Sequence, residues 1–487
     1  MALDELRQVK LDKLNKVRDN GIDPYPSSSL RTHMAAEALE GFTELEKSGE
    51  KIIIAGRVMT KREHGGSVFL DVVDNSGKLQ AYIKKDNLGE EDFTFFVNTV
   101  DVGDFIESEG VVFRTKKGEE TLEVSKYRLL AKSLLPLPEK WHGLQDIEER
   151  YRKRYLDFVF NKDAKDKIIG RSMVTQHIRQ YLIANKFLEV DTPVLQTLYG
   201  GANAKPFKTK LAILDLDLYL RIAPELFLKR MLVGGFERVF EIGRVFRNEG
   251  FDREHNPEFT MLEFYAAYWD YEKMMEFTEG MLVHIVKEMF GKDRVQYQEK
   301  EIEFKTPFKR VTFNDLFNEY ANLDYDSSTQ EELAEKAKEL GIEINKAMTK
   351  GNIADEIYKK VARPNILNPT YIIDHPLEIS PLSKKIPDDP KHVARFQLVV
   401  GGMEVTNGFS ELNDPQDQRE RFEAQEKNAK EGNEEAHRID EDYIEAMEYG
   451  MPPAAGIGIG IDRLSALLTD SHSIREVIAF PLMKPRS

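Results

Sequence analysis

The chain has 487 residues, which is too long for one ordinary core, so we expect two or three domains. Hydrophobic residues make up 41% of the chain and charged residues 32%, a balance that is typical of a globular protein and excludes a disordered one. A net charge of −16, the absence of cysteine and the lack of any long apolar run exclude extensive coating of nucleic acid, disulfides, thiolate metal sites and a membrane-spanning helix.

The N-terminal residues alternate acidic, basic and apolar side chains, so they lack the apolar core of a signal peptide. Together with the absence of cysteine, this favours a cytoplasmic protein. Apolar residues at helical spacing predict an amphipathic helix over residues 1–20.

From residue 52 the apolar residues alternate with a period of two, which is typical of strands. Turn sequences separate five such segments and leave room for a helix over 91–100. The predicted strands are 52–58, 67–73, 78–83, 105–113 and 122–129. Five short strands with one helix fit a small closed barrel of the oligonucleotide-binding type, and a generic β domain fits the strands alone equally well.

A proline-flanked connector at 134–138 closes this region, and mixed helices and strands follow it. We therefore expect a first domain over 1–140, a linker over 141–165 and a second domain over 166–487, with a helix-rich insertion at about 270–365. The elements predicted in the second domain are a helix over 166–185, strands near 187–195, 217–222, 236–247, 371–373 and 395–412, an exposed helix over 420–435 and a final helix from Asp462.

Two apolar segments, VFEIGRVFRNE at 239–249 and HNPEFTMLE at 255–263, are joined by a charged loop. This pattern is typical of a surface hairpin with ion pairs, or of a hairpin whose inner face meets a ligand. In the second case the guanidinium of Arg247 suits a phosphate, because two of its N–H groups can donate together. The upstream segment FLEVDTP at 187–193 predicts a strand that ends at proline and is weak evidence by itself.

The segment AAGIGIGIDRL at 454–464 carries a glycine at every second position from Gly456 to Gly460. Alternating glycines clear one face of a strand, so a ligand or another backbone can approach closely. A helix then begins near Asp462 and presents Arg463 beside the cleared face. The patterns G-x-G-x-x-G and G-x-x-x-x-G-K-[ST] are absent, so any use of ATP is not of the phosphate-loop kind.

In this order, the segments 187–193, 239–263 and 454–464 resemble motifs 1, 2 and 3 of class II aminoacyl-tRNA synthetases. The predicted barrel, followed by YRKRYLD at 151–157, is similar to the subgroup specific for lysine, aspartate and asparagine.

Two further segments, GGANAKPF at 200–207 and NGFSELNDP at 407–415, resemble the lysyl-tRNA synthetase family, and the resemblance covers about residues 3–485. It implies an α+β protein with an N-terminal oligonucleotide-binding β-barrel and a catalytic domain built on an antiparallel sheet flanked by helices. The implied reaction activates L-lysine with ATP to lysyl-adenylate and pyrophosphate, and then transfers lysine to the 3′ end of tRNA-Lys.

The resemblance also implies roles for the residues that would meet ATP. Arg247 matches the arginine that holds the substrate carboxylate against the α-phosphate, where it would stabilise developing charge. Phe259 matches the aromatic that stacks on adenine, and Arg463 matches the cation on the other side of the ring or at the γ-phosphate. His255 and Glu249 match residues of the motif 2 loop near the nucleotide. Arg247, Glu249 and Arg463 form the implied catalytic set.

A pocket for a lysine ammonium needs acceptors for three protons, which two carboxylates and a hydroxyl supply. An aspartate pocket would need a cation in their place, so the sign of charge separates lysine from its subgroup neighbours. The matched residues are Glu263, Tyr265 and Glu411 at the side-chain end, Glu225 and the backbone of Gly201 at the α-ammonium, Arg247 at the carboxylate, and Asn407 and Phe409 along the cavity.

The implied metal is Mg²⁺, which prefers oxygen ligands. Glu404 matches a family carboxylate that binds it. Arg395 and Phe396 match the family, in which a metal-binding glutamate comes next. This chain has Gln397 at that position instead. A neutral amide oxygen at this position either holds the ion more weakly or orients Glu404 or a metal-bound water.

The implied partner of the barrel is the anticodon, since single strands are read by stacking bases on aromatics and bonding their edges. Phe69 matches the stacking position and Gln80 an edge-reading amide, and Arg57 is expected to contact the nucleic-acid backbone. A third family position, a glutamate on the last strand, aligns with Lys126, and the reader of the third base is left open.

Two other functions compete with this prediction. A relative that transfers lysine to a translation factor would lack the barrel. A catalytically silent tRNA-binding protein would carry damage at Arg247, Glu249 or Arg463, and all three are intact. The family also implies a homodimer with the motif 1 helix at its two-fold interface.

Overall fold

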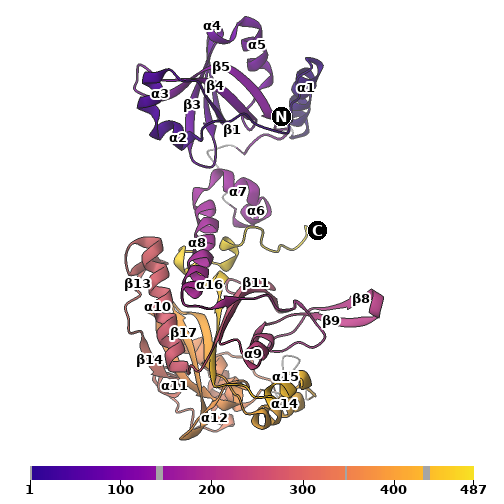
Figure 1. Cartoon of the computed structure of the whole chain (residues 1–487), viewed down its shortest axis with the longest axis vertical. Coiled ribbons are helices and arrows are strands. Elements are labelled where there is room, and N and C mark those ends of the chain that lie inside the picture. Colours follow the sequence, from indigo (N-terminus) through magenta and orange to yellow (C-terminus); the bar gives the residue numbers. More distant parts are fainter. Residues whose placement is uncertain (1–2, 139–145, 346–347, 431–438, 487) are drawn as a thin grey trace. The chain divides into compact units, whose positions relative to one another are not determined.

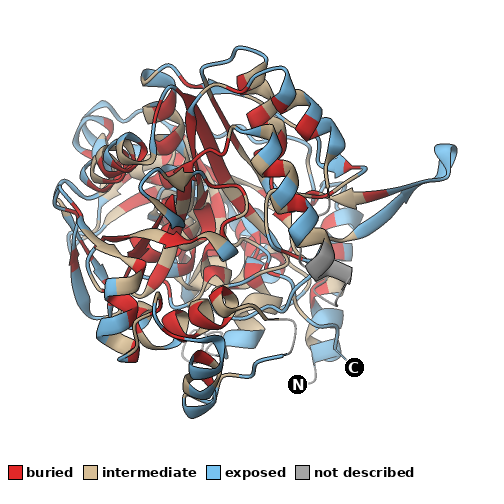
Figure 2. Cartoon of the chain, turned by 90° about the horizontal axis from the view of Figure 1, so that it is seen from below, coloured by how far each residue is buried: buried red, intermediate tan, exposed pale blue. Residues whose placement is uncertain are grey.

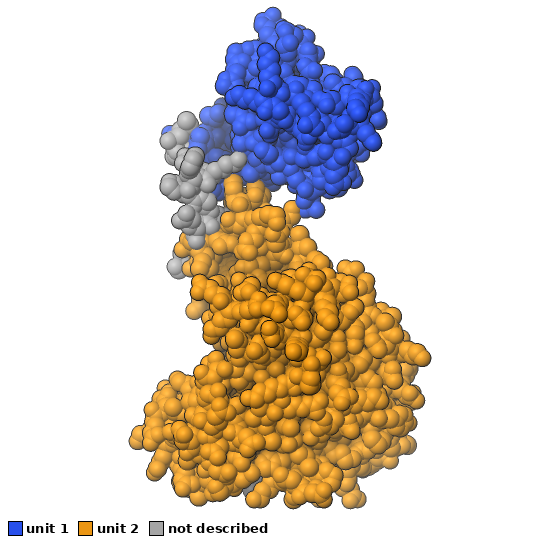
Figure 3. All heavy atoms as spheres, turned by 90° about the vertical axis from the view of Figure 1, so that its left-hand side faces the viewer, with its two compact units in different colours: residues 1–143 blue, residues 144–487 orange. Residues whose placement is uncertain are grey.

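The computed structural model describes residues 3–138, 146–345, 348–430 and 439–486. The chain divides into two compact units, Met1–Gly143 and Leu144–Ser487, which are coloured separately in Figure 3. Among the described residues, no helix combines the length and the apolar character that crossing a bilayer requires.

The first unit is a closed barrel of five strands in the order β1-β2-β3-β5-β4 (Figure 1). Its strands are β1 (Ile52–His64), β2 (Ser67–Val73), β3 (Lys78–Lys84), β4 (Phe105–Arg114) and β5 (Glu120–Ala131). Its helices are α1 (Leu3–Asp19), α2 (Ala35–Glu40), α3 (Phe42–Ser48), α4 (Lys85–Leu88) and α5 (Glu90–Thr99). All five predicted strands and both predicted helices of this region are present.

Alternation of apolar and polar residues makes these segments strands that close on themselves. Ile52, Ile54 and Val58 of β1 point into the barrel core, whereas Ile53, Ala55 and Arg57, which alternate with the buried residues, are half-buried. Successive side chains of a strand face opposite sides, so the same alternation creates an outer face that is free for a ligand.

The second unit is built on a nine-stranded, mostly antiparallel sheet in the order β14-β15-β17-β18-β19-β11-β10-β6, with β16 paired to β17. These strands are β6 (Leu188–Glu189), β10 (Arg238–Phe246), β11 (Glu258–Ala267), β14 (Lys309–Thr312), β15 (Thr370–Pro376), β16 (Lys385–Ile386), β17 (Asp389–Val400), β18 (Met403–Ser410) and β19 (Ala454–Gly460). Only the pairs β14–β15 and β6–β10 are parallel. The predicted fold class is confirmed.

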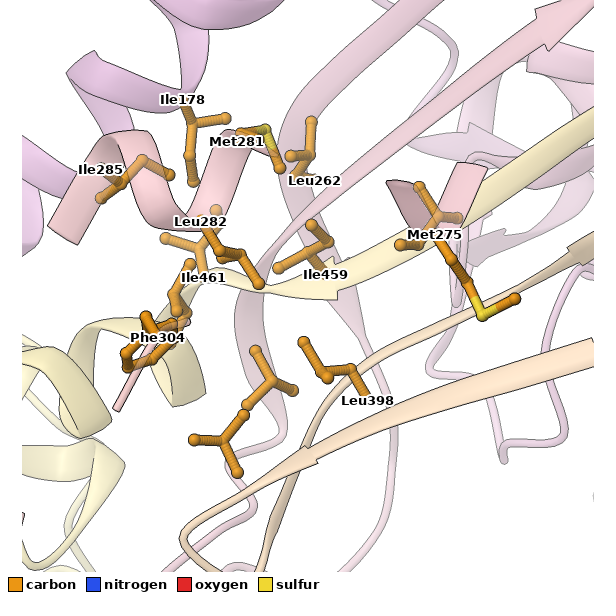
Figure 4. Close-up of a cluster of buried hydrophobic side chains, with 14 of the residues drawn as sticks. Ile178, Leu262, Met275, Met281, Leu282, Ile285, Phe304, Leu398, Ile459 and Ile461 are labelled. Carbon is orange, nitrogen blue, oxygen red and sulfur yellow. The ribbon is translucent and has the colours of Figure 1, made fainter. Parts of the chain in front are cut away.

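Helices cover one face of this sheet, and its core is the largest apolar cluster of the described residues (Figure 4). Ile178 of α8 (Lys162–Ala184) and Leu282 of α10 (Tyr271–Phe290) meet Leu262 of β11 and Ile459 of β19, beside α16 (Ile461–Leu468). In Figure 2 the buried strands form the interior of the unit, with half-exposed helices around them. Residues that alternate with these apolar ones point to the opposite face, where the functional site lies.

The described part of the second unit contains eight further α-helices, of which the first two, α6 and α7, are short and precede α8 in the chain. These helices are α6 (Ile147–Arg152), α7 (Arg154–Phe160), α9 (Glu225–Val233), α11 (Phe313–Ala321), α12 (Gln330–Glu339), α13 (Lys350–Val361), α14 (Pro415–Lys430) and α15 (Glu441–Glu448). Helices α11 to α13 share a separate core with β15 and β17 through Ile372 and Val399.

The interval predicted to be helix-rich, 270–365, also contains strands. A two-stranded hairpin of β12 (Arg294–Tyr297) and β13 (Lys300–Glu303) precedes β14. Its two turn residues, Gln298 and Glu299, have φ values of +49° and +64°. Turn residues with positive φ are normally glycine or asparagine, and neither is present here, so the sequence did not predict this hairpin.

A second hairpin was not predicted in full. β8 (Lys208–Leu211) pairs with β9 (Leu216–Leu220), which also pairs with β7 (Leu195–Gln196), and β8 and β9 project from the rest of the unit (Figure 1). The predicted strand near 187–195 is in fact two short strands, β6 and β7, which belong to different sheets.

The predicted linker over 141–165 is wrong for its described part, because α6, α7 and the start of α8 occupy residues 147–165. Asp157 is fully buried and pairs with Arg150 and Arg154, and Arg154 also donates to the backbone carbonyl of Glu476. A charge-rich segment resembles a linker in sequence, but here the charges pair with one another inside the unit.

The predicted exposed helix over 420–435 begins earlier, as α14 from Pro415, and residues 431–435 lie outside the described residues. It is not wholly exposed, since Phe422 packs in a core with Tyr443 of α15 and Leu228 of α9.

Candidate functional site

A cavity of about 480 Å³ lies on the face of the sheet opposite the main core. Glu263 and Tyr265 of β11 line it, whereas Leu262 and Phe264 point into the core. The same alternation on β19 places Gly456, Gly458 and Gly460 at the cavity and the isoleucines between them in the core. The strand period therefore brings the charged residues and the glycines to one surface.

Most residues predicted for the site line this one cavity, although they come from distant parts of the sequence. They are Gly201, Glu225, Arg247, Glu249, His255, Phe259, Glu263, Tyr265, Glu404, Asn407, Phe409 and Arg463. Two predicted residues, Gln397 and Glu411, are buried near the cavity but do not line it.

Arg247 and Phe259 form one contact pair in the cavity. The guanidinium carbon of Arg247 lies 5.1 Å from the ring centroid of Phe259, and residues 247 and 257 are joined by a backbone hydrogen bond at the end of the β10–β11 hairpin. Burial lowers the pKa of Arg247 from its usual value, but a guanidinium stays charged in proteins. The pair presents a fixed cation beside an aromatic face.

Arg463 is held by acceptors from two directions. It donates to the backbone carbonyls of Glu254 (3.4 Å) and Glu404 (3.2 Å), and its Nη2 lies 3.0 Å from Nε2 of His255. Because Arg463 can only donate, Nε2 of His255 acts as the acceptor and Nδ1 carries the proton toward Asp252, 3.0 Å away.

Asp462, which precedes this arginine in the chain, connects it to the side of the cavity where Phe259 lies. Its carboxylate accepts from the backbone N–H of Thr260 (2.8 Å), next to Phe259, and from Arg171 of α8 (3.0 Å). The residues on either side of the cavity are therefore fixed to a common buried carboxylate.

The other group of residues is acidic and strongly desolvated. Glu263 is 3% exposed and accepts from the hydroxyl of Tyr265 at 2.9 Å. Burial, with the nearby charge of Glu225, raises the pKa of Glu263 to about 8. Burial also raises the pKa of Glu411 to about 8, against the opposing effect of Lys229. A bound cation stabilises the ionised form of such buried carboxylates, which little water reaches.

Sequence reasoning missed Lys229, which is fully buried beneath this acidic group. Its Nζ lies 2.5 Å from Glu225 and 2.5 Å from Glu411, and 5.0 Å from the ring centroid of Phe409. The i, i+4 spacing of Glu225 and Lys229 on one helix was the only signal in the sequence.

Arg395 was also missed as a cavity residue. It donates to the amide oxygen of Asn407 (2.8 Å), the carbonyl of Ile379 and the hydroxyl of Ser380, so it fixes the orientation of Asn407. Nearby, a side chain at Gly456 would overlap the ring of Tyr265 and the carboxylate of Glu411.

The residues predicted to bind metal fit Mg²⁺ only in part. Glu404 lines the cavity, and Oε1 of Gln397 is buried without a hydrogen-bond partner. In the part of the chain that the structure describes, no three histidine or acidic side chains gather to hold a metal by themselves. An ion held by one carboxylate, an amide oxygen and the phosphates of ATP is compatible with this arrangement.

The outer face of the barrel carries a row of partly exposed aromatic residues. Phe69 stacks on Tyr82 with ring centroids 4.6 Å apart, and Tyr82 lies 6.0 Å from Phe113. Gln80, two residues before Tyr82 on β3, accepts a hydrogen bond from Thr121 of β5 (3.0 Å). Phe69 and Gln80 therefore share one face.

The register of β5 concerns the third position, whose reader the sequence left open. Glu123, rather than Lys126, pairs with Tyr82 in the β3–β5 register, and Lys126 follows a bulge and pairs with Glu109. A bulge changes the alternation along a strand, so spacing alone could not place the residue.

Arg57 is engaged within the barrel. Its guanidinium donates to the carbonyl of Gly103 (3.1 Å) and lies 4.3 Å from the ring centroid of Phe105. These contacts account for the residue structurally, and its predicted contact with nucleic acid stays a prediction.

Comparisons with known proteins agree with this architecture. Residues 146–484 match the family described as tRNA synthetases class II (D, K and N), and residues 52–134 match the OB-fold nucleic acid binding domain. The chain is 47% identical to the "Lysine--tRNA ligase" of Bacillus subtilis over 99% of this chain and 98% of that one. It is 49% identical to the protein of the same name from Carboxydothermus hydrogenoformans over 99% of each chain, and 48% to that of Staphylococcus haemolyticus over 99% of each. The chain belongs to the class II tRNA synthetases of the aspartate, lysine and asparagine group, as its motifs predicted.

Proposed function

We propose that the chain is an AMP-forming lysine–tRNA ligase. It joins L-lysine to ATP to give lysyl-adenylate and pyrophosphate, and then transfers lysine to the 3′ end of tRNA-Lys. The observation that carries this proposal is the presence, in one cavity, of the half-buried Arg247 together with the buried carboxylates Glu225 and Glu263. Similarity over the full length to proteins named as lysine–tRNA ligases supports it.

In the first step an oxygen of the lysine carboxylate attacks the α-phosphorus as the bond to pyrophosphate breaks. Arg247 donates to the carboxylate and the α-phosphate together and stabilises the charge that develops between them. Adenine stacks on Phe259, and Arg463 lies across the ring or at the γ-phosphate. His255 and Glu249 contact the nucleotide from the motif 2 loop.

Lysine is selected by charge. Glu263, Tyr265 and Glu411 bind its side-chain ammonium, and Glu225 with the backbone of Gly201 binds its α-ammonium. A neutral amino acid would leave these buried carboxylates without a cation, which costs far more than a missing methylene.

Asn407 and Phe409 line the cavity along the methylene chain of the substrate. The hydrogen bond from Arg395 holds the amide of Asn407 in place, and a side chain at Gly456 would fill the space that the substrate needs.

Mg²⁺ is the proposed ion, and when bound it neutralises the phosphate charges of ATP. Glu404 supplies the carboxylate ligand. The unpaired Oε1 of Gln397 is either a direct ligand or holds a water or Glu404 in position.

The barrel recognises the anticodon of tRNA-Lys by stacking a base on Phe69 and by bonding a base edge through Gln80. Arg57 is proposed to contact the nucleic-acid backbone. Transfer of lysine to tRNA in the cytoplasm completes the proposed reaction.

A homodimer is proposed through α8 and the strands that follow it. Large apolar side chains of this segment are exposed in the single chain, including Ile169 (47%), Ile183 (55%) and Leu195 (51%). A patch of this kind normally marks a protein interface.

The experiment that tests the function is ATP–pyrophosphate exchange with each of the 20 amino acids, followed by charging of a tRNA-Lys transcript. We expect exchange with L-lysine alone and incorporation of lysine into the transcript. Exchange with another amino acid, or none with any, would overturn the proposal. Exchange without charging would indicate a different acceptor, such as a translation factor.

A further inference from the structure

The buried ammonium of Lys229 lies at the centre of the acidic group. It is 2.5 Å from a carboxylate oxygen of Glu225 and 2.5 Å from Oε2 of Glu411, and its side chain has no exposed surface. Glu225 belongs to the same helix, whereas Glu411 follows β18, so the lysine connects two elements that build the lysine end of the cavity.

The distribution of oxygens shows how both carboxylates can serve two cations. Oε2 of Glu411 meets Lys229, and Oε1 lies on the side of Gly456, where even a β-carbon would overlap it. Glu225 lines the cavity while one of its oxygens bonds Lys229. In each carboxylate, therefore, one oxygen contacts Lys229 and the other does not.

The charges in this group can be counted. Glu225, Glu263 and Glu411 carry three negative charges when ionised, and Lys229 carries one positive charge, which leaves two unmatched negative charges. L-Lysine brings two ammonium groups, and its carboxylate is assigned to Arg247. The protein and a dibasic amino acid are thus matched in number of charges.

We propose that Lys229 is a positioning and specificity-determining residue, which fixes Glu225 and Glu411 and, once the three carboxylates are ionised, leaves the number of negative charges that two substrate ammonium groups neutralise. It touches neither the reacting atoms nor ATP. The inference rests on the proposed function, because it takes L-lysine as the substrate.

The groups that act electrostatically on this cluster include cations and phenols from neighbouring elements. They are Tyr443 of α15, Arg230 of α9, Arg395 of β17, and Arg247 and Tyr265 beside the cavity. Lys229 is the closest cation to both carboxylates, and its charge lowers the pKa of each of them against the opposite effect of burial.

Removing the charge of Lys229 should therefore make lysine binding depend more strongly on pH. In Lys229→Met, the carboxylates of Glu225 and Glu411 lie close together without a cation, so at neutral pH they retain more protons than in the unmodified enzyme, and lysine must displace them. A carboxylate whose pKa is raised in the free enzyme binds an ammonium better as the pH rises. We expect the KM for lysine at pH 7 to increase by about tenfold or more, and to approach the unmodified value as the pH rises toward about 9.

The measurement is lysine-dependent ATP–pyrophosphate exchange from pH 6 to 9, with calorimetry in two buffers of different ionisation enthalpy to count the protons released when lysine binds. Lys229→Met should release about one more proton than the unmodified enzyme, with the KM for ATP unchanged. Lys229→Arg should restore the unmodified pH profile. A KM for lysine that rises by the same factor at every pH would show a purely structural role and overturn the proposal.

A matched control is Lys132→Met in the barrel. Lys132 is also fully buried, and its Nζ lies 2.7 Å from Asp101 and 2.7 Å from Asp104. This substitution removes a comparable buried ion pair in the other compact unit. The pH dependence of the KM for lysine should therefore stay as it is in the unmodified enzyme.

A second pair of variants keeps the proposal testable if Lys229→Met does not fold. Glu411→Gln alone leaves one unmatched negative charge, and the double variant Glu411→Gln/Lys229→Met returns to two. Charge matching predicts that adding Lys229→Met to Glu411→Gln lowers the KM for lysine. A structural role predicts that it raises it, and that result would refute the inference. If the unmodified enzyme shows no lysine-dependent exchange, the proposed function has failed instead.

Discussion

The acidic end of the cavity, proposed to bind lysine, and the outer face of the barrel differ most in how far their residues are removed from water. Glu263 and Glu411 are 3% and 1% exposed, whereas Phe69, Gln80 and Tyr82 remain half-exposed on the barrel. A small ammonium offers little surface, so its recognition depends on charges whose desolvation is already complete in the folded protein. A base offers a large flat surface, so a partly exposed aromatic can recognise it by stacking.

The two regions also differ in how they are built. The cavity gathers residues from β11, β18, β19, the motif 2 loop and α16, whereas the aromatic row lies on β2, β3 and β4 of one barrel, with β5 between the last two. A change in the cavity is therefore expected to disturb one precise arrangement, and a change on the barrel to remove one local contact. The following predictions test this difference, in decreasing order of expected effect.

The largest effect is expected from Glu404→Gln, which removes the carboxylate proposed to hold Mg²⁺. Exchange should nearly disappear at any practical Mg²⁺ concentration, because Mg²⁺ needs anionic oxygen ligands. The contact of Arg463 with the backbone carbonyl of Glu404 should persist, since the substitution leaves the backbone unchanged. Exchange at an ordinary rate when Mg²⁺ is raised moderately would show that Glu404 is not an essential ligand.

Next come Glu263→Gln and Glu411→Gln, each of which replaces a buried carboxylate by a neutral amide. We expect each to raise the KM for lysine at least tenfold with the KM for ATP nearly unchanged, because a charge-assisted hydrogen bond in a desolvated site contributes about 1.5–3 kcal/mol. Exchange kinetics measure both constants.

A matched control for these variants is Glu279→Gln, which removes a buried carboxylate of α10 outside the cavity. It should leave the KM for lysine unchanged. Unaltered dependence on lysine in both cavity variants would remove Glu263 and Glu411 from the substrate pocket.

On the barrel, Phe69→Ala should weaken charging of tRNA-Lys by about 1–3 kcal/mol, the contribution of one stacked base. Lysine-dependent exchange without tRNA should be unaffected, because the substitution lies in the other compact unit. Phe69→Tyr keeps the ring and should charge tRNA almost normally. A loss of exchange together with charging would mean that Phe69 acts through folding rather than through the anticodon.

The smallest effect is expected from Gln397→Glu, which introduces a carboxylate where the family resemblance implies one. If Gln397 is a direct ligand, the Mg²⁺ concentration for half-maximal exchange should fall, because the ion gains an anionic oxygen. The buried, unpaired Oε1 of Gln397 motivates this test. An unshifted midpoint would leave Gln397 in a supporting position around Glu404 or a bound water.

Strand alternation and glycine spacing allowed much of the molecule to be predicted from the sequence. The five barrel strands follow from a period of two, which depends only on neighbouring residues. The glycines of 456–460 were assigned to a ligand-facing surface from the same local pattern, whereas Glu263 and Tyr265 were assigned to the pocket by the family resemblance. The structure gathers all of them at one cavity. The family resemblance then added the roles that no local pattern contains.

Local information failed where a contact joins residues far apart in the chain or where the backbone departs from regular geometry. The hairpin at 294–303 turns at Gln298 and Glu299, and these residue types do not predict the positive φ values that both adopt. Residues 147–160 resemble a charged linker, but Asp157 is buried between arginines of the same segment. A bulge between Val124 and Lys126 interrupts the alternation of β5, whereas Glu123, which precedes it, pairs with Tyr82.

The sequence by itself determined which residues alternate, where helices begin, and that the chain carries the motifs of its family, because these depend on spacing along the chain. Only the tertiary structure decided the state of the charges. Lys229 in sequence is one of many lysines on a helix, and its ion pair with Glu411 requires residues 182 positions apart to meet inside the protein. Burial changes the free energy of a charge according to everything around it, and those surroundings exist only after the chain has folded.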